Sequence, residues 1–190
     1  MSHTYFENEH YDATDFEQRK LAKGEYENCT FRNCQFACCD LNEIIFVECD
    51  FQDCDFSMAR LKGTSFREAK FKQCKLLGLR FDECSPLLLS FSFHSCVLNF
   101  SSFYKLKMKG ITFKECKLEE VEFAEADLTN AHFHHCDLTR ATFENTVLAG
   151  ADFRTANNYS LDPDKNKIKK AKFSSAGVLG LLDKYDIVIE

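Results

Sequence analysis

The sequence predicts an all-β fold, a four-sided solenoid in which each coil takes about 20 residues. Three periodic features predict it: a large apolar residue at every fifth position, a small residue two positions before it, and a superperiod of 20 residues. A helix repeats at 3.6 residues and a flat strand at 2, so neither gives a period of five. Repeats of this kind indicate coils that bury their inner faces by stacking on their neighbours.

The large apolar residue recurs in two unbroken series. The first has 16 members, from Phe6 to Phe81, and the second has 14 members, from Leu88 to Phe153. The second series is out of phase by two residues, which predicts a two-residue bulge near 85–88, where a proline interrupts the pattern. We expect all these side chains to point inward and to fill a solid core. Stacking at the spacing of paired strands then gives a rod of about 36 Å.

The small position is occupied by ten of the 11 cysteines, and Cys38 is the exception. Cys96, Cys116 and Cys136 are 20 residues apart, which stacks like residues on one side of a square coil. Zinc sites need closely spaced ligands that converge tetrahedrally, whereas these thiols are 5 or 20 residues apart and parallel. We therefore interpret the cysteines as small buried core residues, and we expect no metal site and no cofactor.

No catalytic set is apparent. His132, His134 and His135 occupy outward positions around the inward Phe133 and should not converge on a metal with Cys136. The chain has no Gly-rich phosphate loop and no Gly-x-Ser-x-Gly motif. A core filled with Phe leaves no cavity for a substrate, so we expect that the protein is not an enzyme.

The composition sets further limits. The length of 190 residues suits one domain, and the net charge of −6 at pH 7 disfavours direct binding to nucleic acid. No run of 18 apolar residues is present, so we expect no membrane span. The N-terminus lacks the basic start and apolar stretch of a signal peptide, so we expect a cytoplasmic protein with reduced thiols.

We expect the whole chain to form one domain in three parts. Residues 1–25 form a degenerate N-terminal coil and cap, residues 26–153 form the regular coils, and residues 154–190 hold a turn, a last repeat and a C-terminal cap. Within the cap, apolar residues of 174–185 recur at helical spacing and predict a short helix. Residues 187–189 predict a short strand.

Three segments carry a motif of a known family. Ala-Asp-Leu at 126–128, Cys-Asp-Leu at 136–138 and Ala-Asp-Phe at 151–153 resemble the repeat of the pentapeptide-repeat family. In that repeat a small residue, a polar residue and Leu or Phe precede two variable positions. The resemblance covers about residues 29–153, and it implies a right-handed quadrilateral β-helix.

The C-terminal tail resembles one branch of the pentapeptide-repeat family in particular. Residues 158–168 and 179–189 are similar to the tails of the quinolone-resistance and microcin-immunity pentapeptide proteins. That branch implies a dimer formed by the C-terminal segment, and a rod that mimics duplex DNA and acts on DNA gyrase and topoisomerase IV. Many quinolone-resistance members carry extended loops tied to drug protection, whereas the mid-rod irregularity here is two residues.

Charged residues occur in alternating runs, and these are the candidate feature for binding a partner. A basic run over 60–80 lies between two acidic runs. Such runs also occur on ordinary solvated faces, and −6 is small beside the roughly 20 charges of a duplex of equal length. Mimicry therefore requires the acids to gather on one side. The candidate acidic surface comprises Asp40, Glu43, Glu48, Asp50, Asp53, Asp55, Glu115, Glu119, Glu120, Glu122 and Glu125.

The apolar side chains of the tail are candidates for a dimer contact, namely Val178, Leu181, Leu182, Ile187 and Ile189. We expect a homodimeric, non-enzymatic protein-binding solenoid that binds DNA gyrase or topoisomerase IV as a DNA mimic. The alternative is a generic interaction scaffold with an unrelated protein partner, because repeat rods present long faces that suit many proteins.

Overall fold

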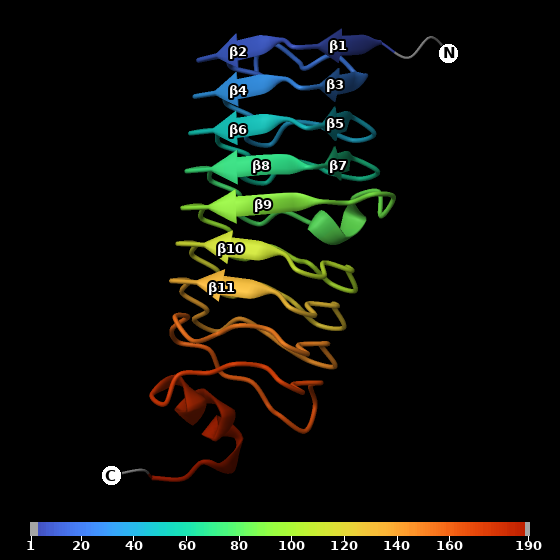
Figure 1. Cartoon of the computed structure of the whole chain (residues 1–190). Coiled ribbons are helices and arrows are strands. Elements are labelled where there is room, and N and C mark those ends of the chain that lie inside the picture. Colours follow the sequence, from blue (N-terminus) through green and yellow to red (C-terminus); the bar gives the residue numbers. More distant parts are fainter. Residues whose placement is uncertain (1–3, 189–190) are drawn as a thin grey trace.

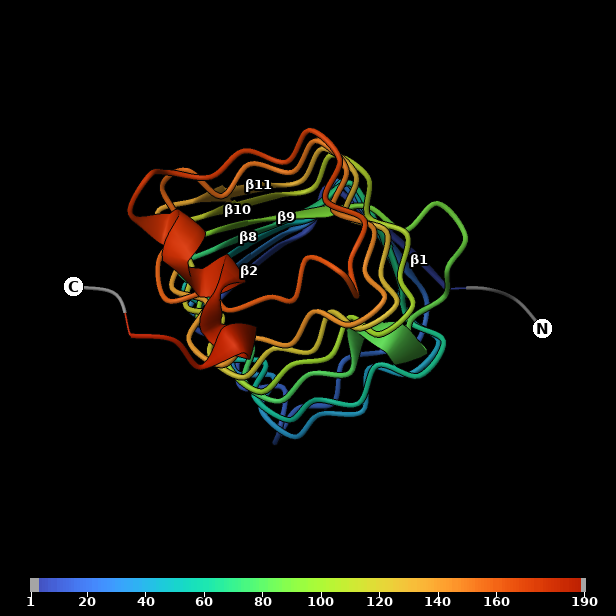
Figure 2. The same cartoon turned by 90° about the horizontal axis from the view of Figure 1, so that it is seen from below.

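Each five-residue unit forms one side of a coil, and four units close the coil into a square outline (Figure 2). The structure is a computed structural model that describes residues 4–188, and it shows a right-handed, all-β solenoid. Successive coils lie on one another along the rod (Figure 1). The fold class expected from the sequence is therefore confirmed.

The strands are short and parallel, and each coil adds a strand to the sheet of the coil before (Figure 1). One sheet has the order β1-β3-β5-β7, and the other has the order β11-β10-β9-β8-β6-β4-β2. The other two sides are joined by single bridges, such as Gln35 to Asp55 and Asp40 to Arg60. The elements are β1 (Tyr5–Glu7), β2 (His10–Asp12), β3 (Glu25–Glu27), β4 (Thr30–Arg32), β5 (Ile45–Val47), β6 (Asp50–Gln52), β7 (Ser65–Arg67), β8 (Ala69–Lys72), η1 (Phe81–Glu83), β9 (Phe91–His94), β10 (Thr112–Lys114), β11 (His132–His134), η2 (Gly177–Leu181) and η3 (Asp183–Tyr185).

The four sides are named here by the large residue that each carries in the third coil. Side A holds Phe46, side B holds Phe51, side C holds Phe56 and side D holds Leu61, and all four side chains are buried. Partners on neighbouring coils are 20 residues apart, as Phe46 and Phe66 are. This register confirms the superperiod predicted from the sequence.

The core consists of stacked rings. On side B, seven phenylalanines from Phe31 to Phe153 stack with ring centroids 4.7 to 5.4 Å apart. Each of the seven is at most 2 % exposed. The separations match the spacing of paired strands, so the backbone ladder and the ring ladder have the same repeat. The expected solid Phe and Leu core is confirmed.

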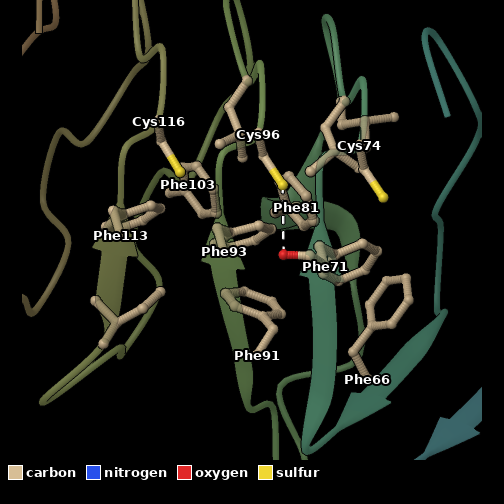
Figure 3. Close-up of a cluster of buried hydrophobic side chains, with 14 of the residues drawn as sticks. Phe66, Phe71, Cys74, Phe81, Phe91, Phe93, Cys96, Phe103, Phe113 and Cys116 are labelled. Atoms are coloured by element: carbon tan, nitrogen blue, oxygen red, sulfur yellow. Dashed lines mark hydrogen bonds between the residues drawn. The ribbon is translucent and has the colours of Figure 1, made fainter. Parts of the chain in front are cut away.

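The stacked cysteines line the same core (Figure 3). Cys74 and Cys96 are each 1 % exposed, and the thiol of Cys96 donates to the carbonyl of Phe71 at 3.4 Å. Burial raises the pKa of the Cys49 thiol to about 12, so that thiol stays protonated at neutral pH. Cys38, which breaks the pattern, is exposed. Within residues 4–188, no group of three or more His, Cys, Asp or Glu side chains is arranged to hold a metal ion.

The register changes once. Between β8 and β9 the partners are 22 residues apart, so that Ala69 faces Phe91. The prediction that Leu88 starts the second inward series is wrong, because Leu88 has a left-handed backbone and is 69 % exposed. The segment before β9 projects from the rod as a loop (Figure 2). Phe91, only 8 % exposed, enters the core in place of Leu88. Its ring packs against those of Phe66, Phe81, Phe93 and Phe103.

At the C-terminal end, η2 and η3 lie across the last coil (Figures 1 and 2). The helix expected over 174–185 is two short 3₁₀ helices instead. Gly177 and Gly180 lower the α-helical propensity of this segment, and Gly180 also packs closely on the rod, where an added Cβ would lie 2.0 Å from the carbonyl oxygen of Tyr159. The carbonyl of Gly180 accepts a hydrogen bond of 3.0 Å from the amide of Leu161, which fixes the segment on the rod. No helix in the described range is long and apolar enough to cross a membrane.

The strand expected over 187–189 is not formed by the residues described there, Ile187 and Val188. Asp186, just before them, adopts the left-handed conformation with φ of 49°, which turns the chain away from the last coil. Ile189 lies outside the described residues.

Candidate interaction surface

Outward side chains occupy two kinds of position on the rod. The residues immediately before and after the buried large residue lie on a flat side, and the residue two places after it lies at a corner. Glu43, Glu48 and Asp53 are corner residues with left-handed φ values of 61°, 51° and 54°, and all three are exposed. The first acidic run therefore contains both kinds of position.

The flat-side acids of this run pair with cations one coil further along. Asp50 is 3.5 Å from Lys70, and Asp55 is 3.7 Å from Lys75. Asp40 lies between Arg60, at 3.5 Å, and a lysine of the preceding coil. The amide of Asn42 and that lysine hold the pKa of Asp40 below its usual range. The basic run thus neutralises half of the first acidic run.

The corner acids of the first run differ. Glu43, Glu48 and Asp53 have no cation within 4.0 Å among the residues that the structure describes. Their charges are therefore the uncompensated part of the first run.

Four of the five acids of the second run lie within 4.0 Å of a Lys, Arg or His side chain. Arg140 pairs with both Glu119 and Glu120, and Glu125 is 3.4 Å from Lys105. Glu115 is 3.4 Å from the ring of His94 and 3.8 Å from the ammonium of Lys114. Glu122 accepts a hydrogen bond of 2.7 Å from the hydroxyl of Ser102.

The two runs do not share one side of the rod. The first run, 40–55, spans most of a coil and the second, 115–125, spans about half of one, so the members of each run are spread over several sides and corners. Asp40 and Glu122 both lie on side D, yet Arg60 and Arg80 occupy the positions between them along that side. Charge on this rod is therefore arranged in belts around it, and not in one continuous acidic strip.

The apolar tail forms a second candidate surface. Val178 and Ile187 are 40 % and 56 % exposed, Leu182 is half-buried, and Leu181 packs against the core. Ile189 lies outside the described residues. Three further side chains of the tail are exposed although they were not among the predicted dimer contacts, namely Leu179, Tyr185 and Val188.

Comparison with protein-family models agrees with the solenoid fold described above. The family model described as "Pentapeptide repeat region" matches residues 44–123 and 80–153, more than half of the chain. The chain belongs to the pentapeptide-repeat family. A search of curated proteins gave no match.

Solved pentapeptide-repeat structures resemble the whole chain. Two trypsin-treated variants of QnrB1, described as a plasmid-mediated fluoroquinolone resistance protein, superpose with TM-scores of 0.70 and 0.62. Their identities to this chain are 15 % and 17 %; each match covers 98 % of this chain, and 92 % and 100 % of the respective QnrB1 chain. Full-length QnrB1 superposes with a TM-score of 0.50 and 17 % identity, over 97 % of this chain and 100 % of QnrB1. At such identities the likeness concerns the fold.

The net charge of this pentapeptide-repeat rod is uneven along its length. Residues 1–57 hold 13 Asp and Glu against 4 Lys and Arg, a net of −9, whereas the rest of the chain nets +3. Residues 4–17, in the first coil, contribute five acids and no Lys or Arg. These acids do not belong to either of the two acidic runs, so the predicted acidic surface does not include them, whereas a running sum of charge along the sequence identifies them.

The three histidines around Phe133 lie on the outside of the pentapeptide-repeat rod. His132 and His134 flank the buried Phe133, and their rings stack with centroids 5.3 Å apart. His135 is an exposed corner residue with φ of 51°. The three rings therefore do not converge on one point.

Proposed function

We propose that this pentapeptide-repeat protein is a non-enzymatic, cytoplasmic protein-binding solenoid whose acidic N-terminal coils occupy the DNA-binding surface of DNA gyrase or topoisomerase IV. The observation that carries the proposal is the net charge of −9 over residues 1–57. These residues make about three coils, or roughly 14 Å of rod. Duplex DNA of that length carries about 8 negative charges. The N-terminal coils therefore match the charge density of DNA, and the remaining coils do not.

The uncompensated corner acids Glu43, Glu48 and Asp53 are the strongest candidates for contacts with cationic groups of such a partner. A partner's cations gain more from carboxylates that lack an ion pair than from carboxylates that already have one. The likeness in fold to QnrB1 supports the same reading.

The test is supercoiling by purified gyrase with and without the protein. We expect reduced supercoiling, or protection from a quinolone or a peptide toxin. The variant E43K/E48K/D53K should lose most of this effect. The matched control E115K/E120K/E125K changes the same charge at corner positions of the second run and should retain it. No effect of the native protein on gyrase or topoisomerase IV in any of these assays would refute the proposal.

We propose further that the exposed tail joins two copies. Val178, Leu179, Tyr185, Ile187 and Val188 expose apolar surface at one end of the rod, and association would remove this surface from water. Light scattering should then give twice the chain mass of 22.0 kDa, and Val178→Asp with Ile187→Asp should give the monomer. A native monomer at micromolar concentration would contradict the dimer.

The second candidate is an interaction scaffold with an unrelated partner. Cross-coil neutralisation of the acidic runs favours it, because much of the acidic charge is already paired. Capture from native lysate separates the two: recovery of topoisomerase subunits supports the first proposal, and recovery of other proteins alone supports the second.

A further inference from the structure

Side B carries a row of cationic and histidine side chains, formed by the residue that follows each buried phenylalanine. Neighbours in this row are partners in the strand register, and the row therefore repeats at about the 4.8 Å spacing of paired strands. It contains no Asp or Glu from its second member onward. Its members from that point are Arg32, Gln52, Lys72, His94, Lys114, His134 and Arg154.

The N-terminal half of this row borders a groove. The groove has a volume of about 390 Å³ and runs over β4, β6, β8 and β9. One wall is Arg32, Gln52, Lys72 and His94, the opposite wall includes Thr30, Lys70 and Ser92, and Phe51 and Phe71 also line it. The opposite wall also carries Asp50, so the walls present cations, hydroxyls and one carboxylate to any occupant.

Two cations of the groove, Arg32 and Lys72, are available for a ligand, whereas His94 lies 3.4 Å from Glu115, and Lys114, further along the row, lies 3.8 Å from the same carboxylate. Arg32 and Lys72 are exposed and have no acidic partner within 4.0 Å in the described part of the chain. The acid in the groove, Asp50, is paired with Lys70 at 3.5 Å. Further along the row, Arg154 is held by Asp152 at 2.7 Å.

We infer that this groove binds an extended acidic segment of a partner protein. Arg and Lys side chains on carboxylates form the stronger, charge-assisted class of hydrogen bond, and a row of cations fits a chain of carboxylates.

The width of the groove favours an extended peptide. Its two walls are two residues apart along each strand, or about 7 Å. The corners on either side carry exposed acids, Glu48 and Glu68 on one edge and Asp53 on the other. A duplex is wider than this strip and would bring its phosphates onto those carboxylates, whereas an extended peptide lies between them.

The groove adjoins the acidic surface proposed to face a topoisomerase, since Glu48 and Asp53 form its edges, but it lies on one flat side and its unpaired side chains have the opposite charge. The groove would therefore bind a second, acidic partner segment, whichever protein the acidic coils bind.

The test is a fluorescence anisotropy titration of the full chain with a labelled peptide in which Glu alternates with Ser over about eight residues, enough to span the groove when extended. We expect saturable binding at low ionic strength that weakens with added salt. Arg32→Glu with Lys72→Glu should weaken binding at least tenfold. The matched control, Lys167→Glu with Lys169→Glu on exposed residues of side A, makes the same change in net charge and should weaken it less than threefold.

Absence of saturable binding would overturn the inference, and so would equal losses in the two double variants, since net charge alone would then explain the effect. A labelled single-stranded oligothymidylate that bound more tightly than the peptide, with the same loss in the Arg32 and Lys72 variant, would overturn the peptide in favour of nucleic acid. Thermal unfolding of each variant checks that the rod is intact.

Discussion

Replacing Phe123 by alanine tests the stacked core directly. Phe123 is fully buried on side D. Its ring stacks on those of Phe103 and Phe143, with centroids 5.3 and 5.2 Å away, and meets the edges of Phe113 and Phe133 at 5.9 Å. Removing it empties a space that four other rings border.

The expected loss follows from this packing. Emptying a buried Phe typically costs about 3–5 kcal/mol, and the value depends on how far the surroundings collapse. Here the coils above and below hold the neighbouring rings at the strand spacing, so they have little freedom to close the cavity. We therefore expect about 4–5 kcal/mol for Phe123→Ala, the upper part of that range.

The free energy of unfolding is measured by urea titration followed by circular dichroism, with calorimetry to check that the transition is two-state. Phe100→Ala is the matched control, because Phe100 is 57 % exposed at a corner. It should change stability by less than about 1 kcal/mol. A loss below about 1 kcal/mol for Phe123→Ala, or equal losses for the two variants, would refute the stacked core.

Three further predictions concern the cap, pH and the thiols. Gly180→Ala should loosen the C-terminal cap, since its Cβ would lie 2.0 Å from the carbonyl oxygen of Tyr159; faster amide hydrogen exchange over 177–185, with the regular coils unchanged, checks this, and unchanged exchange would contradict it. The guanidinium of Arg154 lowers the pKa of Asp152 to about 2, so the ionised carboxylate stabilises the fold above pH ~4 and loses this contribution as the pH falls to about 2. Asp152→Asn should therefore cost about 1–2 kcal/mol in urea titrations at pH 6 and little near pH 2, and an equal cost at both would argue against the ion pair. A thiol reagent should modify Cys38 first in the native protein and all 11 cysteines in urea; rapid modification of most thiols in the native state would mean that the rod is open.

The sequence predicted the fold because the pattern within each five-residue unit shows which residues point into the core and which point to solvent. Phe31, Phe51 and Phe71 are buried where the period placed them, and Cys38 is exposed where it breaks the pattern. The exceptions come from the inserted residues. There the five-residue period predicts that Leu88 is buried, whereas Phe91 is the residue that is buried. Phe91 pairs with Ala69 in the strand register, and that pairing places its side chain in the core.

The acidic surface was predicted less well. The runs were apparent in the sequence, and the superperiod contained the information that Asp40, Asp50 and Asp55 would meet cations 20 residues later. Arg140 shows the limit of that rule, because its side chain reaches Glu119 as well as Glu120, and the 20-residue register predicts only the contact with Glu120.

The sequence by itself determined the square coil, its inward residues and the uneven charge along the rod, because these follow from the order of residues within one repeat. The tertiary structure alone decided how the loop at 85–90 leaves the core, how η2 and η3 close the last coil, and that a cationic groove lies on side B. These features arise from contacts between coils and between side chains distant in sequence, which a five-residue period does not specify.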